Sequence, residues 1–381
     1  RKFHSIEKYD LAVNENSYYL MPFRFHRLNN SKEIIVNEVG DFLIIPNGSF
    51  QKIVNREISK ILDEDLYGDL IANFFISETP IHPLIDVLAT RYRNKKLFLN
   101  HFTDLHIFVI SLRCEHTCHY CQVSRVTQNK DLFDMSLSNI DKGIELMFRS
   151  PNDHVTMEFQ GGEALLAFEN IVYAVEKAEK IAIEKNKSLT KVICTNLALI
   201  TEEILNYCKE HEILISTSLD GPKHIHDSNR TKPHASSYDL TIEGINKSRK
   251  ILGKDHVSAL MTTTRLSLDF PIEIVDEYIN MGFNGIFLRN ISPYGFALRG
   301  NKSKYETDHF ISFYKTALEY IIQKNLEGLN FVEDLARIFL IKILTPFNIG
   351  YVDLQSPSGL INGVIVFNYD GAVYATDESR M

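Results

Sequence analysis

Three cysteines crowd into eight residues of this sequence, within the stretch SLRCEHTCHYCQVSR at residues 111–125. Cys114, Cys118 and Cys121 form a Cys-x3-Cys-x2-Cys loop, and the whole chain has only five cysteines. Thiolates select zinc or iron–sulfur clusters. Structural zinc takes a closed set of four ligands, whereas three thiolates on a [4Fe–4S] cluster leave one iron open to a ligand. The spacing favours an iron–sulfur cluster with an open iron. The alternatives for the three cysteines are a zinc site or buried free thiols.

A fourth thiol or imidazole ligand is hard to find in the sequence. His116 and His119 lie inside the tight loop itself. Cys194 and Cys208 fall in a predicted strand and a predicted helix, and we expect both to be small buried apolar residues. One later loop holds three further histidines, where we expect a solvated polar loop rather than a zinc site: His224, His226 and His234.

The elements that must position the cysteines alternate between strands and helices. Between about residues 105 and 295, helical patterns separate six apolar runs, LHIFVISL, HVTMEFQ, KVICTN, EILISTSLD, HVSALMTTT and FNGIFLRN. Strand–helix units in series imply an α/β fold with a parallel sheet and helices outside it. Six units are fewer than the eight of a closed barrel. We therefore expect an open, partial (β/α)6 barrel.

Unusual residues follow the same end of these strands repeatedly. The cysteines follow the first strand, QGGEALL the second, TNLALI the third, SLDGP the fourth and RNISPYG the sixth. In parallel α/β folds, function gathers on the loops at the carboxyl ends of the strands. This repetition predicts one site at that end of the sheet.

The cysteine loop resembles the signature of the radical S-adenosylmethionine (radical SAM) superfamily. The resemblance implies a [4Fe–4S] cluster whose open iron is chelated by the amino and carboxylate groups of S-adenosylmethionine. It also implies that the backbone of Tyr120, the aromatic residue before the last cysteine, contacts the adenine.

QGGEALL is similar to the GGE motif of the same family. The resemblance implies that Gly161, Gly162 and Glu163 position the amino group of the methionine moiety. Paired glycines let the backbone come close to a ligand, and a carboxylate can accept hydrogen bonds from an ammonium group. Ala164 stands where the family often has proline, and an ordinary turn is the alternative for this motif.

SLDGP and HDSNR resemble a narrower group, the sulfatase-maturase and peptide-modifying branch. That resemblance implies that Ser218 and Arg230 bind the carboxylate of S-adenosylmethionine, and it places Asn196 near the cofactor. One hydroxyl donor and one fork-shaped cation suit a carboxylate. For Asp220 we favour a turn-capping role.

The last fifteen residues, FNYDGAVYATDESRM, resemble the opening of the SPASM/twitch extension of this branch. We expect a truncated hairpin with Asp370 and Gly371 at its turn. The extension normally has a cysteine where this chain has Thr376, and no cysteine lies between 209 and 381. The first auxiliary cluster is therefore expected to be absent or ligated differently. Asp377 matches a catalytic proton acceptor of the sulfatase-maturing members, and a salt bridge at the end of the hairpin is the alternative.

Residues 1 to about 100 read as a separate small α+β domain. EVGDFLIIPNGSFQKIV predicts a hairpin unit with turns at 39–41 and 46–48, and EISKILDEDLYGDLIANFFI predicts an amphipathic helix. This region resembles the winged-helix peptide-recognition element of peptide maturases, and a lid or packing domain is the alternative. We expect three parts: a recognition domain at 1–100, the partial barrel at 101–300, and a helical bridge with the start of the extension at 301–381.

Composition excludes several classes of protein. The net charge is −8 and the sequence pI about 6.0, which argues against a nucleic-acid binder. No apolar run approaches the roughly 20 residues of a membrane span. Five cysteines without a disulfide pattern, and no signal peptide, indicate the cytoplasm. Because the chain begins with Arg1 rather than Met, we expect a piece of a longer protein.

The motifs together predict a radical SAM enzyme that modifies a ribosomally made precursor peptide. YYLMPFRFHRL, VNEVGDFLIIP, LRNISPYGFA and DGAVYATDESRM resemble the radical maturase of the His-Xaa-Ser peptide system. The resemblance implies a substrate with His-Xaa-Ser repeats, a leader bound by the N-terminal domain, and a one-electron donor such as flavodoxin or ferredoxin. Two alternatives remain: a sulfatase-maturase-like oxidase of protein side chains, and a non-catalytic iron–sulfur or zinc-binding scaffold.

Overall fold

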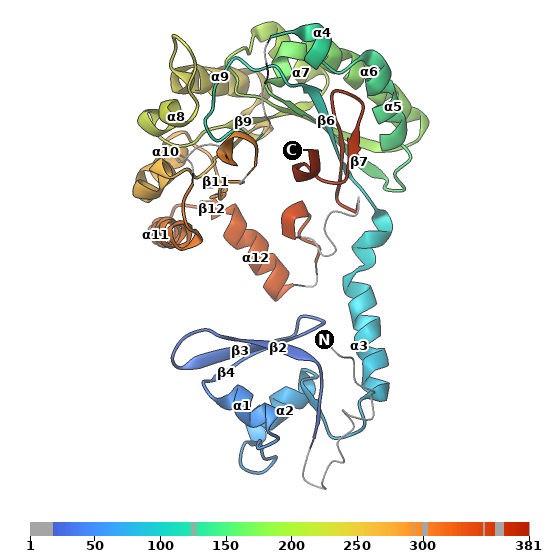
Figure 1. Cartoon of the computed structure of the whole chain (residues 1–381), viewed down its shortest axis with the longest axis vertical. Helices are drawn as coiled ribbons and strands as arrows, with labels where there is room; N and C mark the ends of the chain where they lie inside the picture. The colour runs from blue at the N-terminus through green and yellow to red at the C-terminus, as the bar shows by residue number, and fades with distance from the viewer. Residues whose placement is uncertain are drawn as a thin grey trace. The chain divides into compact units, whose positions relative to one another are not determined.

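The computed structural model describes residues 18–122, 126, 128–292, 294–298, 304–345, 347–354 and 362–380. Pro293 and Met381, which belong to two of the motifs above, lie outside the described residues. The chain divides into two compact units (Figure 1), one formed by residues 1–98 with 346–348 and the other by residues 99–345 with 349–381.

The N-terminal unit is built on a three-stranded antiparallel sheet in the order β2-β3-β4. The turn at 39–41 forms as predicted, because Asn37 N donates to Asp41 O at 3.0 Å and Gly40 adopts a φ of 92°. Its elements are β1 (Tyr19–Leu20), β2 (Phe23–Arg27), β3 (Lys32–Asn37), β4 (Phe42–Pro46), α1 (Ser49–Val54), α2 (Glu64–Ala72), β5 (Ile76–Ser77) and α3 (His82–Lys95).

The single helix predicted for residues 57–76 is wrong in its first part. Only α2 is helical, and residues 60–62 form a turn. The Ser59 hydroxyl accepts hydrogen bonds from the backbone N–H groups of Ile61 and Leu62, and the Asp63 carboxylate accepts one from Ser59 N. These local bonds compete with helix formation, as Ser and Asp side chains do at helix ends.

The second unit is an α/β layer around one seven-stranded sheet in the order β10-β9-β8-β7-β6-β13-β14. All neighbouring pairs are parallel except β13 with β14. The strands are β6 (Leu105–Ser111), β7 (His154–Gly161), β8 (Ser188–Cys194), β9 (Ile213–Ser218), β10 (Val257–Leu260), β11 (Gly285–Ile286), β12 (Val332–Glu333), β13 (Val364–Phe367) and β14 (Val373–Tyr374).

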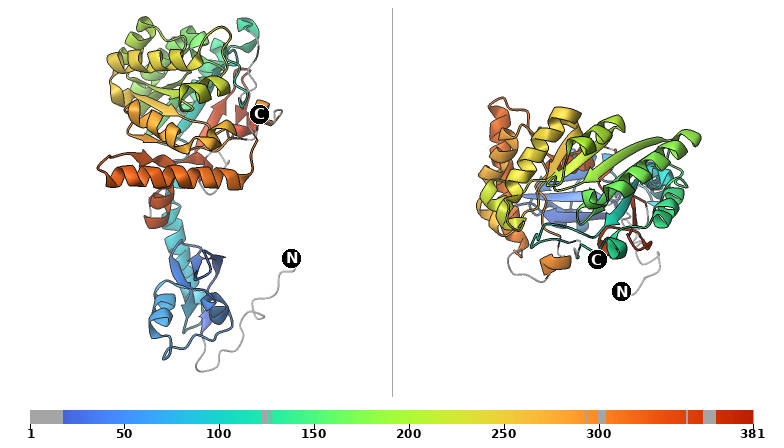
Figure 2. Two further views of the ribbon diagram at one scale, coloured as in Figure 1. Left: turned by 90° about the vertical axis from the view of Figure 1, so that its left-hand side faces the viewer. Right: turned by 90° about the horizontal axis from the view of Figure 1, so that it is seen from above.

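Helices pack on the outer face of this curved sheet (Figure 2). The apolar faces of α5, α6 and α9 meet buried strand residues such as Phe108, Phe159 and Ile215. The helices are α4 (Lys130–Phe133), α5 (Leu137–Met147), α6 (Phe168–Glu184), α7 (Glu202–Glu210), α8 (Lys223–Asn229), α9 (Ser237–Leu252), α10 (Pro271–Asn280), α11 (Thr307–Leu326) and α12 (Asp334–Leu344). The predicted α/β class with a partial barrel is confirmed. Among the described residues no helix is long and apolar enough to cross a bilayer.

The edges of the main sheet differ from the sequence prediction. The sixth predicted strand, residues 283–290, is reduced to β11, which pairs with β12 instead of β10. At the opposite edge, the predicted C-terminal hairpin adds β13 in parallel to β6, in the register Val364 with Leu105. Phe367 of β13 packs against Phe108 with ring centroids 4.8 Å apart. This pairing brings the C-terminal segment beside the cysteine loop.

Candidate active site

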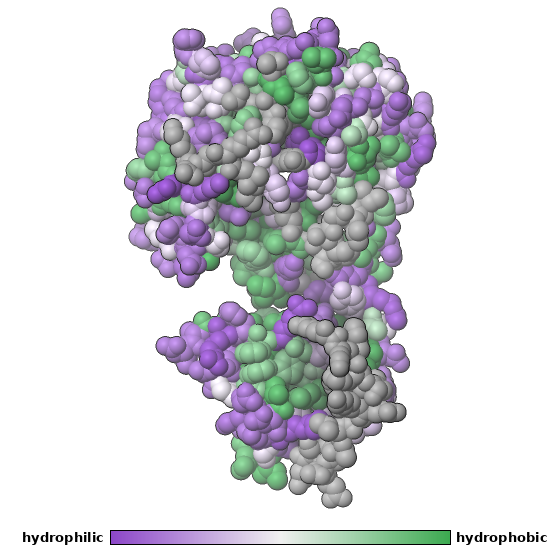
Figure 3. Space-filling view, in the orientation of Figure 1, coloured by the Kyte–Doolittle hydropathy of each residue, from purple (hydrophilic) through white to green (hydrophobic). Residues whose placement is uncertain are grey.

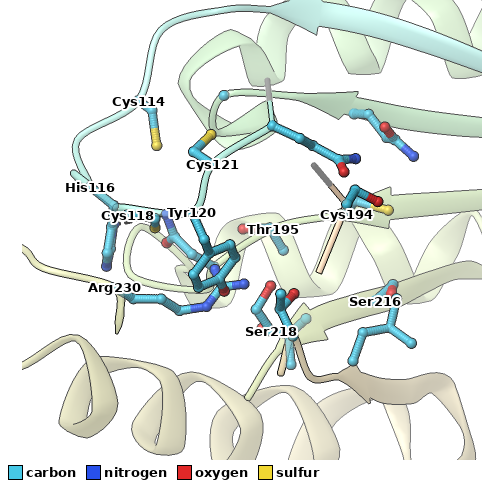
Figure 4. A pocket seen from close by; sticks show the side chains of 18 of the residues that line it. Cys114, His116, Cys118, Tyr120, Cys121, Cys194, Thr195, Ser216, Ser218 and Arg230 are labelled. Atoms are coloured by element: carbon cyan, nitrogen blue, oxygen red, sulfur yellow. Dashed lines mark hydrogen bonds between the residues drawn. The ribbon is translucent and has the colours of Figure 1, made fainter. Parts of the chain in front are cut away.

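The loop that leaves β6 carries three cysteines into one pocket (Figure 4), which has a volume of about 250 Å³. Two backbone bonds tie this loop to the end of α8: Thr117 N donates to Thr231 O at 2.7 Å, and His119 N donates to Asn229 O at 3.3 Å. The same pocket is lined by most of the residues predicted for the site: Cys114, Cys118, Tyr120, Cys121, Gly161, Gly162, Asn196, Ser218 and Arg230.

The paired glycines are required by the close approach of two backbone segments. Gly162 N donates to Ser111 O at 2.8 Å, so the end of β7 lies directly against the start of the cysteine loop. A Cβ on Gly161 would lie 2.0 Å from Ser111 O, and one on Gly162 would lie 2.3 Å from Arg113 O. The glycines therefore fix the wall of the pocket beside the cysteines.

Glu163 points into the protein rather than lining the pocket, and only 1% of it is exposed. One carboxylate oxygen accepts from Thr195 Oγ1 at 2.6 Å and from Leu165 N at 3.0 Å, and the other accepts from Asn196 N at 2.8 Å. Burial raises the pKa of Glu163 to about 7. In this geometry the carboxylate holds the turn after β8, and a role toward an ammonium group stays a prediction.

A buried carboxylate organises the opposite wall. Asp220 has no exposed surface and accepts hydrogen bonds from Tyr120 Oη at 2.8 Å, Asn229 Nδ2 at 3.3 Å and Arg230 Nε at 3.3 Å. A fourth comes from Thr262 N at 3.4 Å. The guanidinium of Arg230 lies 5.4 Å from the centre of the Tyr120 ring. Burial alone would lower the pKa of Arg230, but Asp220 beside it raises it, so this cation is held charged at the pocket.

The turn-capping role expected for Asp220 is therefore wrong. A turn-capping carboxylate would accept from nearby backbone N–H groups. Three of the four donors to Asp220 are instead the side chains of Tyr120, Asn229 and Arg230. Sequence reasoning missed this because the partners are separated by up to 100 residues along the chain.

The expected solvated loop of histidines is also wrong for His226, which is fully buried. Its Nδ1 accepts from Asp220 N at 3.3 Å, its Nε2 is bonded to Ser237 Oγ at 3.1 Å, and burial lowers its pKa to about 4. His224 instead packs on the ring of Phe270. Within the described part of the chain, no three His, Cys, Asp or Glu side chains converge closely enough to hold a single metal ion.

Asn196 and Asp377 reach the site from different directions. The Asn196 amide donates to Glu115 Oε1 at 2.9 Å, and its backbone N–H reaches Glu163. Asp377 accepts from Gln122 Nε2 at 3.1 Å, and its other oxygen accepts from Arg380 Nε at 2.7 Å. The salt bridge named as an alternative for Asp377 is thus present, together with a bond to the cysteine loop.

Cys194 was expected to be a buried apolar residue, but it is only partly buried and lines the pocket. Cys208 is fully buried as expected. The alternation of side chains along a strand could have predicted the position of Cys194. Residues two apart point to the same face, and Cys194 lies two residues before Asn196, which we expect at the cofactor.

Residues 108–266 match the model of the Radical SAM superfamily. Over these residues the chain is similar to radical SAM domains. The chain is 26% identical over 322 residues to the radical SAM cyclopropyl synthase TigE of Paramaledivibacter caminithermalis, covering 78% of this chain and 63% of TigE. It is 27% identical over 120 residues to a cysteine-type anaerobic sulfatase-maturating enzyme of Clostridium perfringens, covering 31% of this chain and 32% of that enzyme. The chain spans between about one third and two thirds of the length of its curated relatives.

Solved structures share the fold of the radical SAM domain. Native anSMEcpe with bound AdoMet aligns with a TM-score of 0.59 and 21% identity, covering 72% of this chain and 74% of that one. Streptococcus suis SuiB bound to its precursor peptide SuiA aligns with a TM-score of 0.52 and 17% identity, covering 96% and 83%. At these identities the likeness shows the fold alone, and the resemblance to a His-Xaa-Ser maturase stays a prediction.

Radical SAM domains use a [4Fe–4S] cluster and S-adenosylmethionine, and the spacing of the loop cysteines fits the cluster motif. The residues present fit these groups. In a cluster each thiolate binds its own iron, so the sulfurs need not converge on one ion as they do for zinc. Burial raises the pKa of Cys118 to about 11 and that of Cys114 further. Such thiols need a metal's positive charge to become thiolates.

Proposed function

We propose that this chain is a radical SAM enzyme that cleaves S-adenosylmethionine reductively and modifies a ribosomally made precursor peptide. The carrying observation is a single pocket in which three loop thiols lie beside Arg230, Ser218 and a paired-glycine wall. When bound there, a reduced [4Fe–4S] cluster supplies the electron that converts S-adenosylmethionine to methionine and a 5′-deoxyadenosyl radical, which takes hydrogen from the substrate.

Polar groups on the pocket wall match the charges of the cofactor. Arg230 is fixed by Asp220 and presents a charged fork suited to the methionine carboxylate, with the Ser218 hydroxyl as a second donor. The wall at Gly161 and Gly162 has no side chains, so backbone groups can reach the amino group. Tyr120 contacts adenine through its backbone in this proposal, because its hydroxyl is already bonded to Asp220.

The N-terminal unit offers a site for the leader of a precursor peptide. β4 is an edge strand of the sheet. Along its antiparallel pairing with β3, hydrogen-bonded and non-hydrogen-bonded residue pairs alternate, and Asn37–Asp41 and Ser31–Asn47 are hydrogen-bonded pairs. This alternation directs the N–H and C=O of Ile44 away from β3, where an added strand could bond to them. An apolar patch lies over part of the N-terminal unit (Figure 3), and 53% of Ile44 is exposed.

A groove of about 610 Å³ runs beside β4 and is lined on its other side by residues 62–66 and Asp69. Its charged lining is mainly acidic: Lys52, Asp63, Glu64, Asp65 and Asp69. We therefore expect the leader to carry basic residues next to the strand that pairs with β4. The core of the peptide would carry the His-Xaa-Ser repeats implied by the outer motifs.

A second candidate is oxidation of a protein side chain, as in sulfatase maturation. The position of Asp377 favours it, since its carboxylate is bonded to Gln122 beside the last loop cysteine. In that reaction Asp377 would accept the proton that leaves the substrate. A one-electron donor such as flavodoxin or ferredoxin is needed in either case.

Anaerobic reconstitution with iron and sulfide tests the enzyme proposal. The unaltered chain should bind about four irons, absorb visible light and release 5′-deoxyadenosine from S-adenosylmethionine under a low-potential reductant. Replacing all three loop cysteines by alanine should abolish all three signals, while Cys208→Ala, a buried thiol outside the pocket, should keep them. One bound zinc and no iron in the unaltered chain would refute the proposal.

Leader binding is tested on the full chain with Ile44→Pro, which removes the outward N–H but no bond to β3. Fluorescence anisotropy with a labelled precursor leader should show loss of binding. Ile44→Ala keeps that N–H and should retain most of the affinity. If the proline variant is folded and binds as well as the alanine variant, strand addition to β4 is wrong. In that case the lid or packing role remains.

A further inference from the structure

The side of the pocket away from the loop cysteines carries a second set of reactive groups. Gln160 on β7, Cys194 on β8 and Ser216 on β9 all line the pocket, and Cys194 is the register partner of Ser216. Figure 4 shows Cys194 and Ser216 on one side, with the loop cysteines and Arg230 on the other. A substrate that reaches this side of the pocket would therefore lie near Cys194.

Cys194 has defined polar partners. The side chains of Glu158 and Ser216 lie close enough to affect the ionisation of its thiol. Glu158 is held in turn by Gln160 Nε2, which donates to it at 2.6 Å. Three polar side chains from the two strands beside β8 thus lie around the thiol of Cys194.

Burial disfavours the ionised form of both acidic groups of this set. Burial raises the pKa of Cys194 well above its usual value. Burial also raises the pKa of Glu158, with the charge of Asp377 acting in the same direction. A neutral thiol is a poor nucleophile, but its S–H bond is weaker than an aliphatic C–H bond, so it readily gives a hydrogen atom to a carbon radical.

We propose that Cys194 is a catalytic residue that donates a hydrogen atom to a carbon radical formed in this pocket. The proposal rests on the radical SAM function proposed above. In this step a C–H bond forms on the radical, the S–H bond of Cys194 breaks, and a thiyl radical remains on the sulfur. One electron from the low-potential donor and one proton from solvent then restore the thiol.

This step makes the overall reaction redox-neutral for the substrate. The 5′-deoxyadenosyl radical removes one hydrogen atom and Cys194 returns another, so the substrate gains and loses no electrons. A change of configuration at carbon or a rearrangement of the carbon skeleton fits this balance. The substrate class is therefore a peptide whose modified residue keeps its oxidation level.

Cleavage of S-adenosylmethionine in D2O without any peptide tests the proposal directly. The thiol then carries deuterium, and with no substrate present the 5′-deoxyadenosyl radical itself is the carbon radical that Cys194 can reach. The unaltered, reconstituted chain, reduced with titanium(III) citrate, should yield mostly singly deuterated 5′-deoxyadenosine by mass spectrometry. Cys208→Ala, which alters a buried thiol outside the pocket, should give the same labelling.

Cys194→Ala and Cys194→Ser should each lose the label from whatever 5′-deoxyadenosine they form, because neither has an S–H group. Measuring the labelled fraction rather than the yield keeps the test valid if these variants turn over slowly. If the unaltered chain gives unlabelled product, or the Cys194 variants keep the label, the proposal is overturned. If no 5′-deoxyadenosine forms at all, the proposed radical SAM function itself fails, and this inference fails with it.

Discussion

Asp220→Asn removes one negative charge from the pocket wall with little change in side-chain shape. Asp220 is fully buried and is the acidic partner of Arg230, whose side chain is 13% exposed. Asparagine can still accept from the Tyr120 hydroxyl through its remaining oxygen. It offers no charge to hold the guanidinium, so Arg230 should no longer stay in the orientation that receives a carboxylate.

The expected magnitudes follow from these contacts. Removing one partner of a buried ion pair costs about 3–5 kcal/mol because the other charge is left uncompensated. Asp220→Ala should approach that loss in free energy of unfolding. Asp220→Asn should lose less stability but weaken S-adenosylmethionine binding by about tenfold, the equivalent of about 1.4 kcal/mol.

The assay is equilibrium binding of S-adenosylmethionine to reconstituted protein, with iron content and chemical denaturation measured on the same samples. Asp227→Asn is the matched control. Its carboxylate accepts from Ser236 Oγ and Tyr238 N, both at 2.8 Å, and does not line the pocket. Full affinity in a folded Asp220→Asn protein, or an equal loss in the control, would show that Asp220 does not position Arg230.

Two further outcomes are expected. Arg230→Ala and Ser218→Ala should retain full iron content but bind S-adenosylmethionine more weakly, with a loss of about 10- to 150-fold for the arginine; unchanged affinity in both would refute their assignment. Because burial raises the pKa of Glu163 to about 7 in the folded chain, its contribution to stability is complete below its unfolded pKa and is lost as pH rises through about 7. The denaturant concentration at the unfolding midpoint of the metal-free protein should decrease as the pH is raised from 5 to 8. Glu163→Gln should make this midpoint less dependent on pH.

Local sequence patterns predicted the barrel well because its elements are set by short-range physics. Strands from β6 to β10 follow apolar runs, and helices such as α5 and α7 begin at the caps Ser136 and Thr201, whose hydroxyls accept from backbone N–H groups. The cysteine loop and the glycine motif could be read in the same way. Each lies at the end of a strand, where a parallel sheet gathers its functional loops.

The missed features depend on partners far apart in sequence. β13 pairs with β6, which lies more than 250 residues earlier in the chain. A local sequence pattern does not predict which edge of a sheet a hairpin joins. Asp220 meets Tyr120 for a similar reason: the loops after two different strands converge at one edge of the sheet. The helix predicted for residues 57–63 is wrong because the prediction rests on apolar periodicity alone. Hydrogen bonds of the Ser59 and Asp63 side chains stabilise a turn there, and α2 begins only after it.

Two groups could finish a radical reaction: Cys194, which lines the pocket, and Asp377, which is bonded to the pocket residue Gln122. The structure favours Cys194. Asp377 could take a proton from the substrate and lead to oxidation, but both of its oxygens already accept hydrogen bonds, from Gln122 and Arg380. Cys194 instead lines the pocket, and burial raises the pKa of its thiol well above the usual value, so its S–H hydrogen is in place. With a peptide in D2O, the two routes separate. Hydrogen return from Cys194 leaves deuterium on carbon in the product, whereas oxidation assisted by Asp377 leaves a product two hydrogens lighter and unlabelled.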